Sequence, residues 1–91
     1  MSHPTFDHEL DTRGLRCPEP VMMLHQSIRG AQAGDCIKVV ATDPSTQRDI
    51  PKFCGFLGHI LVESIGPVDD THDNSDPNQL VYIYWVQKKA G

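Results

Sequence analysis

The sequence has little of what a membrane protein, a secreted protein or a nucleic-acid-binding protein needs. Its apolar runs are only a few residues long, whereas a membrane-spanning helix needs about 20 apolar residues. The first residues are polar and acidic and lack the basic start and apolar stretch of a secretory signal. Basic residues are outnumbered, with 8 Lys and Arg against 12 Asp and Glu, for a formal net charge of −4. We therefore expect a cytoplasmic protein that has no membrane partner and does not bind nucleic acid directly.

Cysteine is also scarce. The three cysteines, Cys17, Cys36 and Cys54, form no Cys-x-x-Cys pair. An odd number of cysteines in a cytoplasmic protein argues against a disulfide framework, and a structural zinc site needs four ligands in close pairs. The five histidines are scattered without ligand spacing. We expect no metal site and at least one free thiol.

The length of 91 residues allows one hydrophobic core, so we expect a single domain over residues 1–91. Residues 1–7 are expected to be flexible. Residues 66–78 contain two prolines and four aspartates but no Lys or Arg, and predict an acidic loop. The four aspartates account for the acidic surplus, because the rest of the chain has eight acidic and eight basic residues.

The apolar periodicity predicts a fold of the order βαβαββ. Strands are expected over residues 8–11, 36–42, 59–65 and 79–87, and helices over residues 18–29 and from about 48 to 57. The second helix is expected to start there because Pro51 belongs in a first turn. This order predicts an α/β (α+β) two-layer sandwich, with two helices on one face of a four-stranded mixed sheet. The expected core consists of Ile37, Val39, Phe53, Leu57, Val62, Ile83 and Trp85.

Cys17 immediately precedes the first predicted helix. A thiolate there would face unpaired backbone N–H groups and the positive end of the helix dipole, which lower a cysteine pKa. Pro18, Glu19 and Pro20 form the first turn, and the Glu19 N–H is the expected donor to the sulfur because Pro20 has no N–H. The alternative from the residues alone is a small apolar side chain that only fills the junction before the helix.

Basic and aromatic residues mark a possible partner surface. Arg13 and Arg16 lie close to Cys17 in sequence and would favour a thiolate. Arg48 and Lys52 would join them if the two helices start at the same sheet edge, where positive charge would guide an acidic partner. Phe56 falls off the apolar face of the second helix and is a candidate contact. Of the other thiols, Cys54 is expected in the core, and Cys36 is a weaker candidate for a second reactive thiol.

Two segments of the chain resemble the TusA (SirA-like) family of sulfur carriers. The first is residues 10–21, LDTRGLRCPEPV, which contains a CPxP motif, and the second is residues 43–59, DPSTQRDIPKFCGFLGH. The resemblance extends over most of the chain and implies the same βαβαββ sandwich. It also implies a sulfurtransferase whose Cys17 takes sulfane sulfur from a cysteine desulfurase as a persulfide and relays it to an acceptor protein.

The resemblance leaves the pathway open. The best-known members of the family supply 2-thiolation of the tRNA wobble uridine, and others supply molybdenum-cofactor synthesis or sulfur oxidation. Two other functions stay open on the residues alone. One is a non-catalytic regulatory module that binds a partner protein. The other is a redox sensor that joins Cys17 to Cys36, which requires Cα atoms within about 7 Å.

Overall fold

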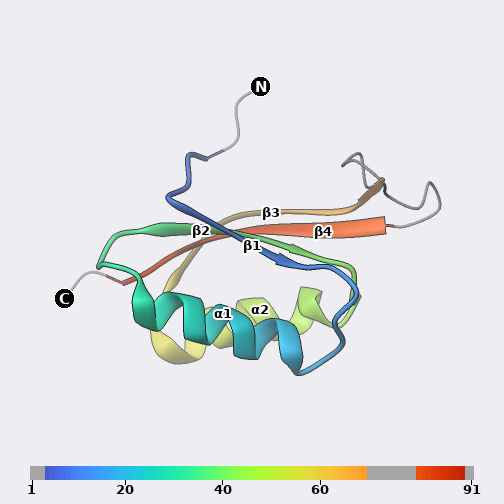
Figure 1. Cartoon of the computed structure of the whole chain (residues 1–91), viewed down its shortest axis with the longest axis horizontal. Helices are drawn as coiled ribbons and strands as arrows, with labels where there is room; N and C mark the ends of the chain where they lie inside the picture. Colours follow the sequence, from blue (N-terminus) through green and yellow to red (C-terminus); the bar gives the residue numbers. More distant parts are fainter. Residues whose placement is uncertain (1–3, 70–79, 90–91) are drawn as a thin grey trace.

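A computed structural model describes residues 4–69 and 80–89 and confirms the predicted order of elements (Figure 1). The elements are β1 (His8–Thr12), α1 (Glu19–Gly30), β2 (Cys36–Ala41), α2 (Thr46–Leu57), β3 (Ile60–Asp69) and β4 (Leu80–Gln87). None of the helices in the described ranges is long and apolar enough to cross a membrane.

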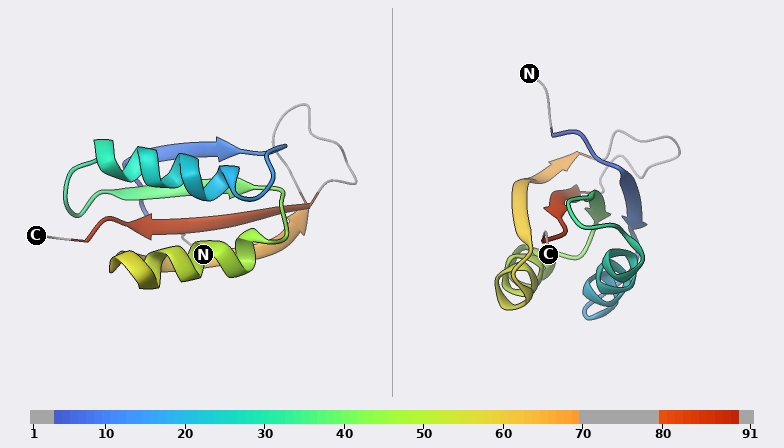
Figure 2. Two further views of the ribbon diagram at one scale, coloured as in Figure 1. Left: turned by 90° about the horizontal axis from the view of Figure 1, so that it is seen from below. Right: turned by 90° about the vertical axis from the view of Figure 1, so that its left-hand side faces the viewer.

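The four strands form one mixed sheet in the order β1-β2-β4-β3. β1 and β2 are parallel neighbours, whereas β4 is antiparallel to both β2 and β3, as predicted for the last two strands. Both helices lie on the same face of the sheet (Figure 2). α1 packs against β1 and β2, and α2 packs against β3 and β4. The fold is therefore the two-layer sandwich that the sequence predicts.

The main core lies between the sheet and the two helices. Residues paired across neighbouring strands point to the same face, so Ile37 with Val86 and Val39 with Tyr84 line the helix side. Leu24 of α1 and Ile50 of α2 fill the space opposite them, and both are fully buried. The cluster of buried residues is Leu24, Ile28, Ala31, Ile37, Val39, Ala41, Ile50, Cys54, Tyr82, Tyr84 and Val86.

The predicted core residues do not all face the helices. Trp85 is buried, as predicted, but it pairs with Lys38, and Ile83 pairs with Val40, so both point away from the helices. Val62 is 44% exposed, and it follows Leu61, which packs against the helix-side core, at an irregularity of β3. Side chains alternate between the two faces of a strand, and the sequence of a strand with apolar residues on both faces does not show which face meets the helices.

The second helix starts earlier than predicted. Asp43 accepts a hydrogen bond from the Ser45 N–H at 3.0 Å, and its carbonyl accepts one from the Thr46 hydroxyl at 2.7 Å. These bonds fix the turn before α2, which begins at Thr46. Pro51 consequently lies inside the helix and not in its first turn. It is tolerated there with its ring exposed to solvent.

The predicted acidic loop and the predicted flexible start of the chain also differ from the structure. β3 continues to Asp69, so residues 66–69 of the predicted acidic loop belong to a strand, and residues 70–78 lie outside the described residues. At the other end, the Asp7 N–H donates to the Cys36 carbonyl at 2.8 Å, and the Cys36 N–H donates to the Asp7 carboxylate at 2.9 Å. The chain is therefore anchored at Asp7, before β1 begins.

Candidate functional site

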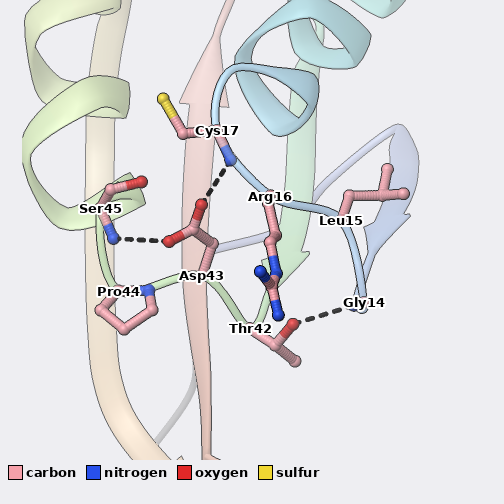
Figure 3. Close-up of a pocket in the computed structure, with 8 residues that line it drawn as sticks. All are labelled: Gly14, Leu15, Arg16, Cys17, Thr42, Asp43, Pro44 and Ser45. Carbon is pink, nitrogen blue, oxygen red and sulfur yellow. Dashed lines mark hydrogen bonds between the residues drawn. The ribbon is translucent and has the colours of Figure 1, made fainter.

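The site forms where the loops after β1 and β2 meet. Because parallel strands end at the same sheet edge, both loops leave the sheet side by side and each leads into a helix. Two hydrogen bonds join the loops (Figure 3). The Gly14 N–H donates to the Thr42 hydroxyl at 2.8 Å, and the Cys17 N–H donates to the Asp43 carboxylate at 2.5 Å. The loop after β2 thus holds the backbone of Cys17 in place.

Cys17 is exposed and lies one residue before the N-cap of α1, which is Pro18. The Cys17–Pro18 peptide bond is cis. Pro20 is buried and attaches the first turn to the core, whereas Glu19 is exposed. The Glu19 N–H, the expected donor to the sulfur, instead donates to the Arg16 carbonyl at 2.8 Å. The first turn of α1 therefore positions the cysteine backbone without supplying that hydrogen bond to the thiol.

The Cys17 thiol donates a hydrogen bond to Asp49 of α2, with an Sγ–Oδ2 distance of 3.1 Å. This bond raises the pKa of the thiol, and loss of hydration and the negative charge of Asp49 raise it further. The nearby Ser45 hydroxyl opposes the rise, and the charge of Asp43 adds to it. The prediction of a lowered pKa is therefore wrong, because tertiary contacts place carboxylates closer to the sulfur than the basic residues that neighbour it in sequence.

The predicted basic residues do not gather around the sulfur. Arg13 pairs with the Asp11 carboxylate at 2.9 Å. Arg16 extends toward Thr42 while the cysteine sulfur points the other way (Figure 3). Arg48 lies in the same turn as Asp49 and its Nε donates to Asp49 Oδ1 at 3.0 Å. Arg48 is thus paired with the same carboxylate that accepts the hydrogen bond of the thiol.

Cys17 also borders an apolar groove of about 490 Å³. It is lined by Cys17, Pro18, Val21, Asp49, Lys52, Phe53 and Phe56. The Phe56 side chain is 88% exposed, which is unusual for an aromatic ring. The structure therefore brings two of the predicted contact residues, Lys52 and Phe56, to the groove beside Cys17.

The other two cysteines are buried. Burial raises the pKa of Cys54 to about 11, and it also raises the pKa of Cys36, to which the charge of Asp7 adds. Cys36 starts β2, whereas Cys17 lies beside Asp43, beyond the far end of this six-residue strand. Since such a strand spans about 20 Å, the two thiols cannot form the disulfide that the redox-sensor alternative requires.

The histidines of the described ranges have structural contacts. His8 pairs with Asp35 at 2.9 Å. His25 packs edge-on against Phe53, and His59 accepts a hydrogen bond from the Lys89 N–H at 3.1 Å. Within residues 4–69 and 80–89, no group of three His, Cys, Asp or Glu side chains could hold a metal ion.

Sequence reasoning missed the roles of Asp43 and Asp49. From the sequence, Asp43 with Pro44 is expected only as a turn before the second helix, and Asp49 only as part of a family motif. The topology of the fold could have indicated these roles. Asp43 lies in the loop after the second strand and Asp49 in the first turn of the second helix. Since parallel strands end at the same sheet edge, both residues should lie beside the loop after the first strand. Their contacts with Cys17 bridge 26 and 32 positions and cannot be read from local patterns.

Comparison with known proteins identifies the family. The family model described as "Sulfurtransferase TusA" matches residues 8–72, which includes both loops of the site. The chain belongs to the TusA sulfurtransferase family. The chain is 52% identical over 90 residues to the sulfur carrier protein TusA of Pseudomonas paraeruginosa (strain DSM 24068 / PA7). It is 50% identical over 90 residues to that of Pseudomonas putida (strain GB-1). Both matches cover 99% of this chain and 99% of the relative.

Membership of the TusA family makes this chain a sulfurtransferase of the sulfur-carrier type. A carrier must exchange sulfur with other proteins, so the chemistry needs a thiol that a second protein can reach. Cys17 is exposed and borders an open groove, whereas the other two thiols are enclosed.

Proposed function

We propose that Cys17 accepts sulfane sulfur from a cysteine desulfurase as a persulfide and passes it to an acceptor protein. The observation that carries this proposal is the exposure of Cys17 in a chain whose other two cysteines are buried. The names of the relatives support sulfur carriage but specify neither the residue nor the donor.

The chemistry is two thiol exchanges. The Cys17 sulfur attacks the outer sulfur of the donor's persulfide, a new S–S bond forms, and the donor cysteine leaves as a thiolate that takes up a proton. The outer sulfur of the Cys17 persulfide is then attacked by an acceptor thiolate, and Cys17 leaves. Sulfur is transferred without net oxidation or reduction, so no cofactor is needed.

The groove beside Cys17 is the proposed entry for the donor's persulfide-bearing segment. Its apolar lining gives such a segment a surface to cover, and the Phe56 ring stands at its exposed rim. Lys52 in the groove and the exposed side chain of Arg16 nearby give this side of the molecule positive charge for an acidic partner. Arg13 and Arg48 are weaker contacts, because Asp11 and Asp49 already pair with them.

We further propose that the sulfur is destined for 2-thiolation of the tRNA wobble uridine, through an acceptor protein that handles the tRNA. The acidic net charge favours a carrier that meets proteins and does not grip tRNA itself. Delivery to molybdenum-cofactor synthesis or to sulfur oxidation is the alternative. Proteins that co-purify with a Cys17→Ala variant will distinguish these pathways.

Mass spectrometry after incubation with a cysteine desulfurase and cysteine tests the proposal directly. The wild-type protein should gain sulfur on Cys17, and Cys17→Ser should gain none. Cys36→Ala is the matched control, because it removes a thiol that is enclosed and should leave loading intact. In the same assay, Phe56→Ala should load more slowly. Full loading of Cys17→Ser would disprove the assignment.

The alternative is a regulatory module in which Cys17 only shapes the start of α1. It predicts that alkylation of Cys17 leaves partner binding intact and that the protein gains no sulfur from the desulfurase. The sulfur-carrier proposal predicts the opposite for both measurements.

A further inference from the structure

A carboxylate touches the atom that exchanges sulfur. Asp49 lies in the first turn of α2, and its Oδ2 accepts the hydrogen bond of the Cys17 thiol at 3.1 Å. No other described side chain has a hydrogen bond to this sulfur within normal distance. The contact joins Cys17 to α2, a helix outside the CPxP motif, so it forms only because the fold brings α2 beside the reactive loop.

The Asp49 carboxylate is held in position from its other side. Arg48 Nε donates to Oδ1 at 3.0 Å, which leaves Oδ2 directed at the sulfur. The hydrogen bonds from Cys17 and Arg48 lower the pKa of Asp49, so the carboxylate is ionised at neutral pH. The thiol beside it is mostly protonated at neutral pH because its pKa is raised. The lowered pKa makes Asp49 a weak base at rest, so the proton can pass along the existing hydrogen bond only as the S–H group becomes acidic during attack on the donor.

We propose that Asp49 is a catalytic residue that accepts the Cys17 thiol proton during sulfur uptake and returns it to the donor's leaving thiolate. This inference rests on the proposed function. As Sγ attacks the outer sulfur of the donor persulfide, its S–H bond breaks and the proton passes to Asp49 Oδ2. The donor S–S bond breaks, and the donor thiolate takes the proton from Asp49. The products are a Cys17 persulfide, a donor thiol and an Asp49 carboxylate, so atoms and charge balance.

The surrounding groups suit a proton that moves with the attack. Asp43 and Asp49 disfavour a free thiolate on Cys17 before the donor arrives. Ser45 Oγ is buried, has no hydrogen-bond partner within normal distance, and favours negative charge on the sulfur. The cations on this side of the molecule are Arg48, which is engaged with Asp49, and Arg16 and Lys52. A thiol in this setting is protected while idle and gives up its proton when the donor is in place.

A purely electrostatic role of Asp49 predicts a different result for the same variant. If the carboxylate only suppresses the thiolate, Asp49→Asn lowers the thiol pKa and speeds every reaction of Cys17. If the carboxylate also carries the proton, Asp49→Asn speeds reaction with a small alkylating agent but slows sulfur uptake from a protein donor.

The experiment therefore measures two rates on the same variant. For Asp49→Asn at pH 7, we expect faster alkylation by iodoacetamide and single-turnover sulfur uptake from a persulfide-loaded desulfurase that is slower by about 100-fold, the lower range for general acid–base catalysis. Uptake by the variant should rise with pH until the thiol is ionised. Asp35→Asn, which removes a carboxylate paired with His8, is the matched control for charge and should leave both rates unchanged.

The outcomes separate the two proposals. Uptake by Asp49→Asn that equals or exceeds the wild-type rate overturns the role of Asp49 while the sulfur-carrier function stands. Sulfur on wild-type protein at a site other than Cys17 overturns the proposed function itself. Protection of Cys36 and Cys54 from iodoacetamide shows that the variant is folded. If they react, Asp49→Ser is tested in its place against the same two outcomes.

Discussion

At the scale of single residues, the carboxylates of Asp43 and Asp49 perform different tasks around Cys17. Asp43 binds the backbone N–H groups of Cys17 and Ser45, so it fixes the positions of the reactive loop and of the turn before α2 together. Asp49 binds the sulfur. A substitution of Asp43 will therefore change mainly the geometry of the loop, and a substitution of Asp49 will change mainly the protonation state of the thiol.

A buried pair of hydroxyl groups links the site to the core. Thr46 Oγ1 and the Tyr84 hydroxyl lie 2.7 Å apart, and both residues are buried. Thr46→Val should destabilise the protein by about 1–3 kcal/mol, because the Tyr84 hydroxyl loses its partner and Asp43 loses a donor. Tyr84→Phe alone should cost about 1 kcal/mol.

Urea unfolding of both single variants and the double variant measures this coupling. The double variant should be more stable than the sum of the single effects predicts, because it leaves no buried Tyr84 hydroxyl without a partner. Strictly additive effects would mean that the two hydroxyl groups do not depend on each other.

Residue roles were predictable where local pattern decides them. The position of Cys17 before a helix and of Cys54 on an apolar helix face follows from spacing, and the structure places both there. The protonation state of Cys17 was not predictable in this way. It depends on Asp49, which is distant in sequence and reaches the sulfur only after α2 has packed beside α1.

At the scale of elements, β3 depends on one glycine. Gly66 has a φ of +131°, a conformation that side-chain-bearing residues rarely adopt. A Cβ added there would lie 2.8 Å from the Val81 carbonyl oxygen and 2.9 Å from Tyr82 Cα. The neighbouring strand therefore leaves no room for a side chain at this point of the sheet.

Gly66→Ala should destabilise the protein by about 2 kcal/mol or more, because both the backbone angle and the contact with β4 are unfavourable. Gly55→Ala is the matched control. Gly55 lies in α2 with no atom within 4 Å of an added Cβ, so its substitution should stabilise the helix by about 0.5–1 kcal/mol. Chemical unfolding of the two variants compares them, and equal effects would contradict the role of Gly66.

The elements themselves were predicted well because each has a clear apolar period. The predicted boundaries are wrong where distant contacts or backbone geometry determine the end of a helix or strand. The start of α2 depends on Asp43 and Ser45, whose hydrogen bond forms a turn two residues earlier than Pro51 suggested. The end of β3 depends on pairing with Val81 and Leu80, which the proline and glycine of that segment concealed.

At the scale of the whole molecule, several aspartates tie stability to pH. Asp35 has a lowered pKa because of hydrogen bonds from His8 and the Gln32 N–H. The pKa values of Asp43 and Asp49 are lowered by bonds from backbone and side-chain donors around the site. A lowered folded-state pKa means that the carboxylate stabilises the fold above the unfolded-state value of about 3.9, and this contribution is lost as the pH falls through the folded-state value.

We therefore expect the urea midpoint to be steady near neutral pH and to fall below about pH 4. Asp35→Asn should reduce the size of this fall, because it removes one of the titrating groups. Unfolding curves at a series of pH values provide the measurement. A midpoint that stays constant or rises between pH 5 and pH 3 would show that these carboxylates do not link folding to protonation.

The fold class followed from the order of elements, but the order of strands within the sheet did not. Local patterns show that β4 is a strand without showing that it lies between β2 and β3. That choice is made by pairing on both sides, where Val86 lies opposite Ile37 of β2 and Leu61 of β3. Such pairs are selected by the fit of two distant segments, which a single sequence does not display.

The central place of β4 has a consequence for synthesis of the protein. β4 is the last of the four strands to be translated, yet it joins β3 to the rest of the sheet. A nascent chain on the ribosome can pair β1 with β2, but β3 has no neighbour until residues 80–87 have left the exit tunnel. The packing of α2 that brings Asp49 to Cys17 is therefore completed only after β4 has joined the sheet, so the thiol should acquire its carboxylate partner after the other three strands have been made.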